Sequence, residues 1–350
     1  MNIGSRIESI GVYIPERIMT TSSIVDRLKL PGSLKLELMT GISERRVCSE
    51  TEDSLVLALE ATKDCLKHSS IRSENVEMII FCAISRYVDG LKYVYEPAIS
   101  LMLKEKLGMD RAIAFDISNA CAGMLTGMHI GTDFIERGEV NNCLVVSGEY
   151  ITSLSQNAVN NIKSHTSSEI ASLTVGDAGG AMLLCKTHSD EEKICVSKFV
   201  TLGKYCDLCI GYQSNKQAGG IMETQMKPIH DASIRHAPSI IEEALSEAGL
   251  KMGQIDCLIP HQTSKHAIKA GREHIGAYFG EMAKEVIINL EMVGNTASTS
   301  HALAMYKLLK EKRLKKGERV MLLSFASGLV IGVIIFTIQS LTDQYGDVHS

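Results

Sequence analysis

Hydrophobic residues in this chain form short apolar runs that alternate with longer amphipathic stretches. Residues 76–85 and 142–148 are nearly continuous apolar runs of strand length, whereas residues 54–68 place leucine and alanine at helical spacing. Strands that are covered on both faces have such continuous runs, because helices pack against both sides of a parallel sheet. The pattern therefore predicts an α/β fold built on a mostly parallel, covered sheet.

The second half of the chain repeats the order of elements in the first. A helix over 240–250 and a strand over 255–264 match the helix and strand that end at residue 85. A small-residue turn, a helix, a stop of one basic residue and glycine, and a strand follow from residue 295, as they do from residue 121. Self-similarity at a period of about 180 residues indicates a duplicated α/β unit. We predict two halves, residues 1–186 and 187–350.

Composition narrows the class of protein. The 350 residues carry a net charge of −5 without any Lys/Arg run, so we expect no nucleic-acid partner. The ten cysteines have no regular spacing, and the N-terminus has no secretory signal. Both features favour the reducing cytoplasm over an extracellular disulfide framework.

The one segment that resembles a membrane span is residues 320–338, which contain no charged residue. The segment is rich in β-branched residues, and Ala-Ser-Gly interrupts it at residues 326–328. Two buried strands joined by a small-residue loop explain this composition better than one helix. We therefore expect no membrane span.

Cys121 lies where a predicted short buried strand, ending at Asp116, turns into a predicted buried helix that ends near Gly138. Backbone N–H groups and the helix dipole converge on such a position, and both favour a thiolate over a thiol. The small residues at 120, 122 and 123 would leave room for a substrate beside the sulfur. The alternative is that Cys121 is a small core residue.

His261 ends a predicted strand, and Asn295 opens a predicted helix in the second half. Taken singly, they could be a core histidine and a turn or helix-cap residue. Matching strand ends of the two halves should face one another, so both residues could converge with Cys121. A neutral imidazole and an amide can donate hydrogen bonds to a thioester carbonyl oxygen.

Three motifs resemble those of the β-ketoacyl-ACP synthase III branch of the thiolase-fold condensing enzymes. They are Asp-Ile-Ser-Asn-Ala-Cys-Ala-Gly at 116–123, Ile-Pro-His-Gln at 259–262 and Gly-Asn-Thr-Ala-Ser at 294–298. Residues 324–328 resemble the C-terminal glycine loop of that family, and residues 176–180 its mid-chain Gly-Asp motif. The resemblance implies a duplicated, five-layer α/β/α/β/α thiolase-like fold and a homodimer.

The resemblance also implies roles for these residues. Cys121 would accept an acyl group from a thioester, and His261 and Asn295 would bind the carbonyl of a malonyl thioester as it loses CO₂. The backbone N–H groups of Cys121 and Gly328 would form the oxyanion hole. The substrates would be acyl-CoA or acyl-carrier-protein thioesters in fatty-acid-like or specialised metabolism, with no cofactor and no metal.

Three alternatives to decarboxylative condensation stay open at this point. The acyl group on Cys121 could pass to an alcohol or an amine, or two acyl thioesters could condense without decarboxylation. The chain could also be a catalytically silent partner subunit of a heteromeric synthase. A silent subunit has no physical need for the cysteine, the histidine and the asparagine, which argues against this last alternative.

The chain departs from the family pattern at several positions. It has no tryptophan to stack on the adenine of coenzyme A, and residues 41–46 keep only the neighbouring Gly-Ile-x-Glu-Arg pattern. The glycine loop is reduced to Ala-Ser-Gly. Cys206 and Cys209 have a CxxC spacing, but no second Cys/His pair follows at zinc-finger distance, so we expect neither a metal nor a redox site.

Glu96 stands where the family usually has an apolar residue that reaches into the acyl pocket of the partner subunit. It could face solvent after a local loop shift. It could instead be a buried carboxylate that acts as a base, as in relatives that join two acyl chains head to head. Ser85 occupies the place of the glutamate base of hydroxymethylglutaryl-CoA synthases, so that branch is disfavoured.

Overall fold

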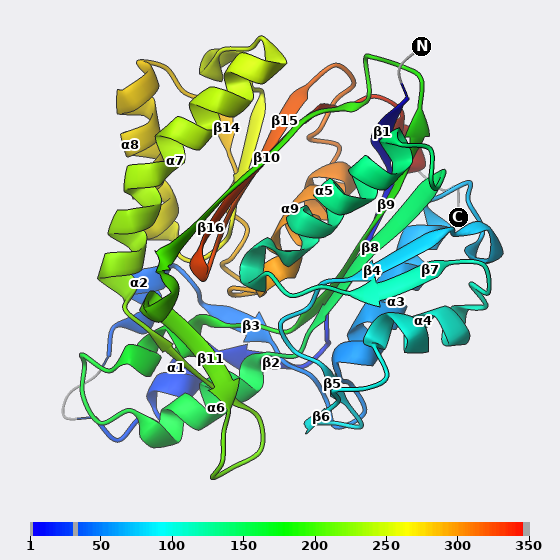
Figure 1. Ribbon diagram of the computed structural model, residues 1–350. Coiled ribbons are helices and arrows are strands. Elements are labelled where there is room, and N and C mark those ends of the chain that lie inside the picture. Colours follow the sequence, from blue (N-terminus) through cyan, green and yellow to red (C-terminus); the bar gives the residue numbers. More distant parts are fainter. Residues whose placement is uncertain (1–2, 31–33, 346–350) are drawn as a thin grey trace.

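The structure is a computed structural model that describes residues 3–30 and 34–345. Two five-stranded sheets form its frame (Figure 1). In spatial order, the first sheet consists of β1 (Gly4–Tyr13), β9 (Ala178–Thr187), β8 (Asn142–Glu149), β4 (Met78–Phe81) and β7 (Ile113–Asp116). The second consists of β10 (Ile194–Tyr205), β16 (Gly328–Thr337), β15 (Arg319–Ala326), β13 (Cys257–Pro260) and β14 (Glu285–Val286).

The two sheets have the same pattern of strand directions. In the first, β9 is antiparallel to both β1 and β8, whereas β4 is parallel to β8 and β7. In the second, β16 is antiparallel to both β10 and β15, whereas β13 is parallel to β15 and β14. The duplicated α/β fold is thus confirmed. The expectation of mostly parallel sheets is wrong, because half of the strand pairs in each sheet are antiparallel.

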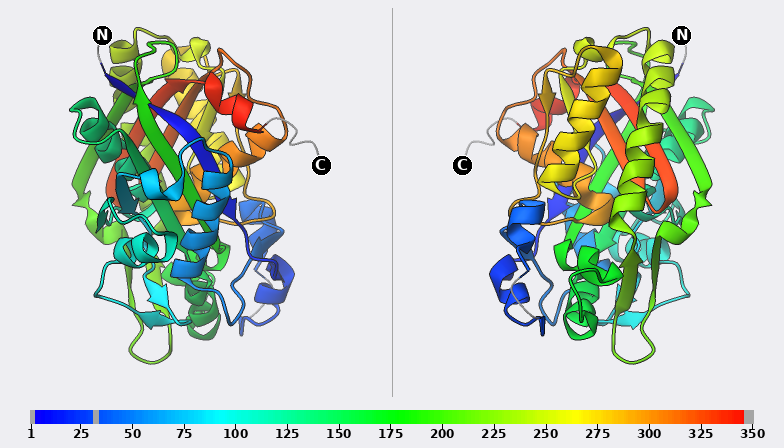
Figure 2. Two further views of the ribbon diagram at one scale, coloured as in Figure 1. Left: turned by 90° about the vertical axis from the view of Figure 1, so that its right-hand side faces the viewer. Right: turned by 90° about the vertical axis from the view of Figure 1, so that its left-hand side faces the viewer.

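Helices complete a five-layer arrangement (Figures 1 and 2). One pair covers the outer face of the first sheet, a second pair covers the outer face of the second sheet, and a third pair lies between the sheets. These pairs are α3 (Ser54–Lys67) with α4 (Ile99–Leu107), α7 (Met226–Ala248) with α8 (Lys265–Phe279), and α5 (Gly123–Glu136) with α9 (Ser300–Lys310).

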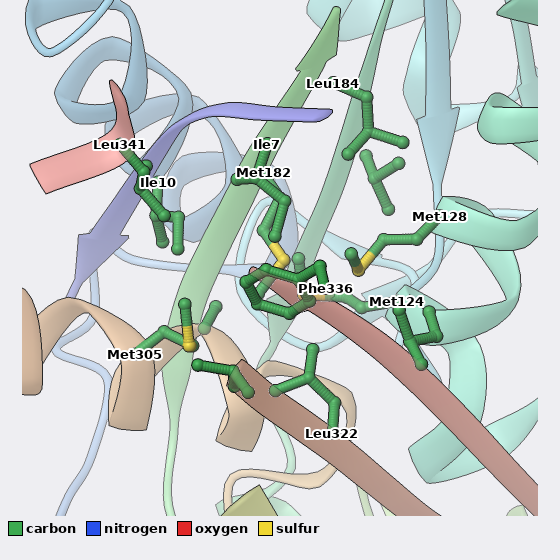
Figure 3. Close-up of a cluster of buried hydrophobic side chains, with 14 of the residues drawn as sticks. Ile7, Ile10, Met124, Met128, Met182, Leu184, Met305, Leu322, Phe336 and Leu341 are labelled. Atoms are coloured by element: carbon green, nitrogen blue, oxygen red, sulfur yellow. The ribbon is translucent and has the colours of Figure 1, made fainter. Parts of the chain in front are cut away.

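The central core fills the space around the two inner helices (Figure 3). Met124 and Met128 of α5 and Met305 of α9 are fully buried there, together with Met182 of β9 and Phe336 of β16. A helix that lies between two sheets exposes few of its residues to solvent. This explains why small and apolar residues predominate in both α5 and α9. Burying each such side chain contributes about 1.5–3 kcal/mol.

Several sequence predictions can be compared with the observed elements. The uncharged residues 320–338 form β15 and β16, and no helix among the described residues is long and apolar enough to cross a membrane. The helix predicted over 240–250 is the last part of α7, which begins earlier, at Met226. Pro238 lies inside this helix and does not end it. The strand ending at Asp116 is not buried, because β7 is an edge strand and Ile113 is 49% exposed.

Smaller elements gather at the lower end of Figure 1, beyond the carboxyl ends of the parallel strands. They include a hairpin and a helix that the sequence pattern did not predict. These elements are α1 (Thr21–Val25), α2 (Leu36–Thr40), α6 (Thr152–Asn161), β2 (Ile18–Thr20), β3 (Glu44–Arg46), β5 (Tyr87–Val88), β6 (Lys92–Tyr93), β11 (Cys209–Gln213) and β12 (Gly220–Thr224).

Helix α3 lies directly on the backbone of the first sheet. Gly11, Gly148 and Gly179, from the neighbouring strands β1, β8 and β9, face the helix. A Cβ atom at Gly179 would lie 2.0 Å from the carbonyl oxygen of Leu57. Because the clashing atom belongs to the helix backbone, it cannot rotate away, and the helix would have to move off the sheet.

We expect Gly179→Ala to lower the free energy of unfolding by about 1–3 kcal/mol, since an added methyl overpacks this contact. Urea denaturation of the variant and the wild type measures the difference. Gly203→Ala in β10 is the matched control, because a Cβ atom there has no neighbour within 4 Å. Equal destabilisation by the two substitutions would contradict the backbone contact as the cause.

Candidate active site

A cavity of about 1000 Å³ lies beyond the carboxyl ends of the parallel strands, and Cys121, His261 and Asn295 all line it. Cys121 follows β7, His261 follows β13, and Asn295 lies before α9. The structure therefore brings together three side chains that are far apart in the sequence. Mostly apolar side chains from β11, β12, α6, α7 and α8 form the rest of the wall.

Cys121 is the middle residue of the 3₁₀ turn η2 (Ala120–Ala122), which leads directly into α5. Ala120 has φ 45°, a left-handed conformation that turns the chain sharply before the cysteine. Ala120 and Cys121 line the cavity, whereas Ala122 is fully buried. Gly123 gives no room to a substrate, because a Cβ atom there would meet the carbonyl oxygen of Cys82 at 2.4 Å.

Burial raises the pKa of the Cys121 thiol well above its ordinary value, and the carboxyl group of Glu149 raises it further. The resting side chain is accordingly a neutral thiol. The sequence predicts a thiolate from the helix start alone. The cost of burying a charged sulfur outweighs the favourable effect of the helix dipole and the backbone N–H groups here. Any reaction at this sulfur therefore requires the loss of the thiol proton.

His261 is held at the base of the cavity by both its backbone and its ring. Its N–H donates to the carbonyl oxygen of Leu323 at 2.8 Å, and its Nδ1 lies 3.0 Å from Ser300 Oγ. Burial, followed by the neighbouring His301, lowers the pKa of His261 to about 3. The imidazole is therefore neutral at physiological pH.

His301 is a second buried histidine, with its ring centroid 6.3 Å from that of His261. Its Nε2 donates to the same carbonyl oxygen, that of Leu323, at 3.2 Å. Nδ1 of His301 has no hydrogen-bond partner within the described part of the chain. Burial lowers the pKa of His301 to about 4, so this ring is neutral as well.

The side chain of Asn295 is oriented by its own turn. Its Oδ1 accepts from the N–H of Ala297 at 3.0 Å, and its backbone pairs with Thr174 and Gly176. The NH₂ group forms no hydrogen bond within residues 3–30 and 34–345 and is the end of the amide left to donate. This orientation suits a hydrogen-bond donor to a carbonyl oxygen in the cavity.

Asp177 explains why the Gly-Asp motif lies near the site. Its carboxyl group accepts from the N–H groups of Cys48, Ile151 and Thr152, each at 2.8 Å, and from Thr152 Oγ1 at 2.6 Å. A Cβ atom at the preceding Gly176 would lie 2.0 Å from the carbonyl oxygen of Val293. The motif thus fixes the loop against which the Asn295 turn pairs.

Glu149 is a buried residue near the site that the sequence reasoning missed. It ends β8, is fully buried, and accepts hydrogen bonds from the N–H of Ile84 and from Ser298 Oγ. Burial raises the pKa of its carboxyl group to about 7. The available signal was a carboxylate at the end of an otherwise apolar strand.

The two remaining predicted residues differ in their placement. Gly328 begins β16 with φ 131°, beside the cavity-lining Ser327, and Ala326 packs in one apolar cluster with Cys121. Glu96 is exposed and does not line the cavity of its own chain.

The two cysteines of the CxxC pair differ in their surroundings. Cys209 lines the cavity, whereas Cys206 is exposed, and both are free thiols. No group of three or more His, Cys, Asp or Glu residues suited to a metal ion occurs among the residues that the structure describes.

Comparison with known proteins decides the family. Residues 115–203 match the family 3-oxoacyl-[acyl-carrier-protein] synthase III, and residues 245–338 match its C-terminal domain. The β-ketoacyl-[acyl-carrier-protein] synthase III 1 of Halalkalibacterium halodurans is 27% identical, over 93% of this chain and 96% of that protein. The synthase III of Koribacter versatilis is also 27% identical, over 95% and 97%. The chain belongs to the synthase III family of condensing enzymes.

Solved structures confirm the thiolase-like fold of this synthase. The crystal structure of the synthase III from Aquifex aeolicus superposes with a TM-score of 0.81, at 23% identity, and covers 96% of this chain and 100% of that one. An OleA variant from Xanthomonas campestris superposes with a TM-score of 0.83, at 24% identity and 97% coverage of both chains.

The neutral state of His301 predicts a pH-dependent stability. Below pH 6.5 the unfolded imidazole takes up a proton, whereas the folded one, with a pKa of about 4, does not, so the free energy of unfolding falls as the pH falls through this window. Between pH 6.5 and about pH 5 the loss amounts to about 2 kcal/mol. Urea denaturation of the wild type and His301→Gln at both pH values measures it.

The His301→Gln variant should show a decrease that is smaller by this amount. His188→Gln is the control, since that imidazole is exposed in the folded state as well as in the unfolded state. A decrease of equal size in His301→Gln and the wild type would contradict the assignment of a buried, neutral His301.

Proposed function

We propose that this synthase loads an acyl group onto Cys121 and condenses it with a malonyl thioester that loses CO₂. The observation that carries the proposal is the convergence of a nucleophile and two neutral hydrogen-bond donors, from His261 and Asn295, on one apolar cavity. A carbanion equivalent needs its oxyanion stabilised more than it needs a strong base. Two neutral donors supply this stabilisation without becoming acids that would protonate the carbanion.

In the first step the sulfur of Cys121 attacks the carbonyl carbon of an acyl thioester. The carbon–sulfur bond to the donor breaks, and the thiol proton leaves with the donor thiolate, which keeps the charge in balance. The N–H groups of Cys121 and Gly328 would stabilise the oxyanion of the tetrahedral intermediate. A resting thiol at Cys121 suits this step, because the proton that the leaving group needs is already present.

In the second step the malonyl thioester loses CO₂, and its enolate oxygen is held by His261 and Asn295. For His261 to donate from Nε2, its Nδ1 must accept the hydroxyl proton of Ser300, and the distance of 3.0 Å permits this. The enolate carbon then attacks the acyl carbonyl carbon and expels the sulfur of Cys121 as a thiolate, which takes up one proton from the solvent to restore the resting thiol. Each well-placed donor lowers the barrier by about 3 kcal/mol.

We also infer that the synthase is a homodimer in which the β7 edges meet. Ile113 on β7 is 49% exposed, and Tyr95, in the loop before α4, is 78% exposed. Asp116 binds the start of α4 to the end of β7, because its carboxylate accepts from the N–H groups of Ile99 and Ser100, the first two residues of that helix. An unpaired edge strand with exposed apolar side chains is suited to pairing with a second copy.

A dimer of this kind would give Glu96 a function in the neighbouring cavity. Glu96 is exposed and does not line the cavity of its own chain, although the preceding Tyr95 does, so its carboxylate is available to a partner subunit. This position favours a second candidate function, the condensation of two acyl thioesters without decarboxylation, which requires a base. Acyl-CoA or acyl-carrier-protein donors in the cytoplasm would serve either function, in keeping with ten free cysteines.

Intact-protein mass spectrometry tests the primary proposal. After incubation with a panel of acyl-CoA and acyl-carrier-protein thioesters, the wild type should gain the mass of one acyl group, and Cys121→Ala should gain none. Addition of malonyl thioester should discharge the adduct with release of one CO₂. Cys209→Ala, which removes the other thiol of the cavity wall, is the control and should still load.

Each other outcome points away from decarboxylative condensation. An adduct that ignores malonyl thioester would favour transfer to another acceptor or non-decarboxylative condensation. The absence of any adduct would leave the silent-subunit alternative.

Glu96→Gln separates the two condensation reactions. We expect the variant to load Cys121 and to react with malonyl thioester as the wild type does, because decarboxylation needs no base. Any product that the wild type forms from two acyl thioesters should decrease by about 10²-fold or more in the variant. The exposed Glu105→Gln of α4 is the control. A wild type that forms no such product, or a variant that keeps it, would exclude Glu96 as the base.

A further inference from the structure

Glu149 occupies the junction between the two halves of the fold. Its Oε1 accepts from Ser298 Oγ and, at 3.3 Å, from Ser147 Oγ, while both carboxylate oxygens lie within 3.2 Å of the N–H of Ile84. The Oγ atoms of Ser147 and Ser298 lie 2.7 Å apart, and both residues are fully buried. The carboxyl group thus ties the loop after β4 and the turn before α9 to the end of β8.

The duplicated fold places two equivalent turns beside this carboxyl group. Ala120 opens η2 with φ 45°, and Ala297 opens η6 (Ala297–Thr299) with φ 47°, before α5 and α9 respectively. Cys121 and Ser298 are therefore the corresponding middle residues of the two turns. Ser298 donates a hydrogen bond to Glu149, and the preceding Ala297 packs in one apolar cluster with Cys121, so the thiol lies in the turn next to the carboxyl group. The carboxyl group raises the pKa of this thiol.

No cation balances the charge of Glu149. It forms no ion pair within the described ranges, and its donors are hydroxyl and backbone N–H groups. The ionisable groups that face it are the thiols of Cys121 and of Cys82 on β4. On the β9 side, the carboxyl group of Asp177 is occupied by the N–H groups of Ile151 and Thr152.

We propose that Glu149 is a positioning residue for Cys121, because its buried carboxylate, once ionised, opposes the loss of the Cys121 thiol proton. The proposal rests on the nucleophilic role of Cys121 proposed above, and no bond is made to Glu149. Two like charges in a buried site of low dielectric disfavour each other strongly.

The reactivity of the Cys121 thiol should depend on pH through the charge of Glu149. The pKa of Glu149 is about 7, so the carboxyl group is neutral in mildly acidic solution and ionised in mildly alkaline solution. Its ionisation makes the loss of the Cys121 proton harder just where the pH would otherwise promote it. The reactivity of the thiol should therefore rise less than tenfold per pH unit near neutrality.

Alkylation by iodoacetamide, a neutral reagent, tests this without any substrate. The modified fraction of the Cys121 peptide is measured against time from about pH 5.5 to pH 9 in the wild type and in Glu149→Gln. We expect the plot of the logarithm of the alkylation rate against pH to bend near neutral pH in the wild type. In the variant the same plot should be a straight line of unit slope. Above the bend the variant should react faster, on the order of tenfold, which corresponds to one pK unit.

Glu8→Gln is the matched control, because Glu8 is another buried glutamate of the first sheet, paired with Arg6 and not placed near Cys121. It should reproduce the bent profile of the wild type. Should Glu149→Gln not fold, Ser298→Ala serves instead: it removes a hydrogen bond that favours the carboxylate, so the bend should move to higher pH. Circular dichroism establishes which variants are folded.

Two results would overturn the proposal: a wild-type profile of unit slope throughout, or a bend that persists unchanged in a folded Glu149→Gln. Both can be separated from failure of the proposed function, which the acyl-loading experiment reports. A Cys121 that loads acyl groups but alkylates with unit slope would leave the condensing function standing and remove only the role of Glu149.

Discussion

The meeting of two equivalent turns beside one buried carboxyl group is the constraint on which the site depends. Each turn begins with an alanine in a left-handed conformation, Ala120 or Ala297, and leads into one of the two helices between the sheets. Such conformations cost on the order of 1–3 kcal/mol and persist only where the surroundings enforce them. Here the packing of two sheets around α5 and α9 provides that enforcement, so the core positions both turns beside the cavity.

Burial then decides the protonation state of each group at the site. It keeps the imidazoles of His261 and His301 neutral, it keeps the thiol of Cys121 protonated, and it brings the pKa of Glu149 to about 7. These states suit condensation chemistry, because a neutral donor stabilises an oxyanion without quenching the carbanion beside it. A solvent-exposed version of the same residues would hold an ionised carboxylate and a partly protonated histidine at neutral pH.

The sequence predicted the features that depend on local pattern and order. The duplication, the strand pair within residues 320–338 and the convergence of Cys121, His261 and Asn295 all follow from repeated strand–helix order, which fixes where strand ends meet. It could not predict the resting thiol, because the helix start is local whereas desolvation depends on the whole fold. For the same reason it missed Glu149, whose partners lie 65 and 149 residues away.

The duplication also places two different residues at the equivalent middle positions of the two turns. The middle residue of the first turn is Cys121, which faces the cavity, and that of the second is Ser298, which is fully buried and donates to Glu149. A second ionisable thiol at Ser298 would compete for the same charge in the same buried site, whereas a hydroxyl stays neutral and satisfies the carboxyl group. At this pair of equivalent positions the two halves therefore differ in one side-chain atom, sulfur in Cys121 and oxygen in Ser298.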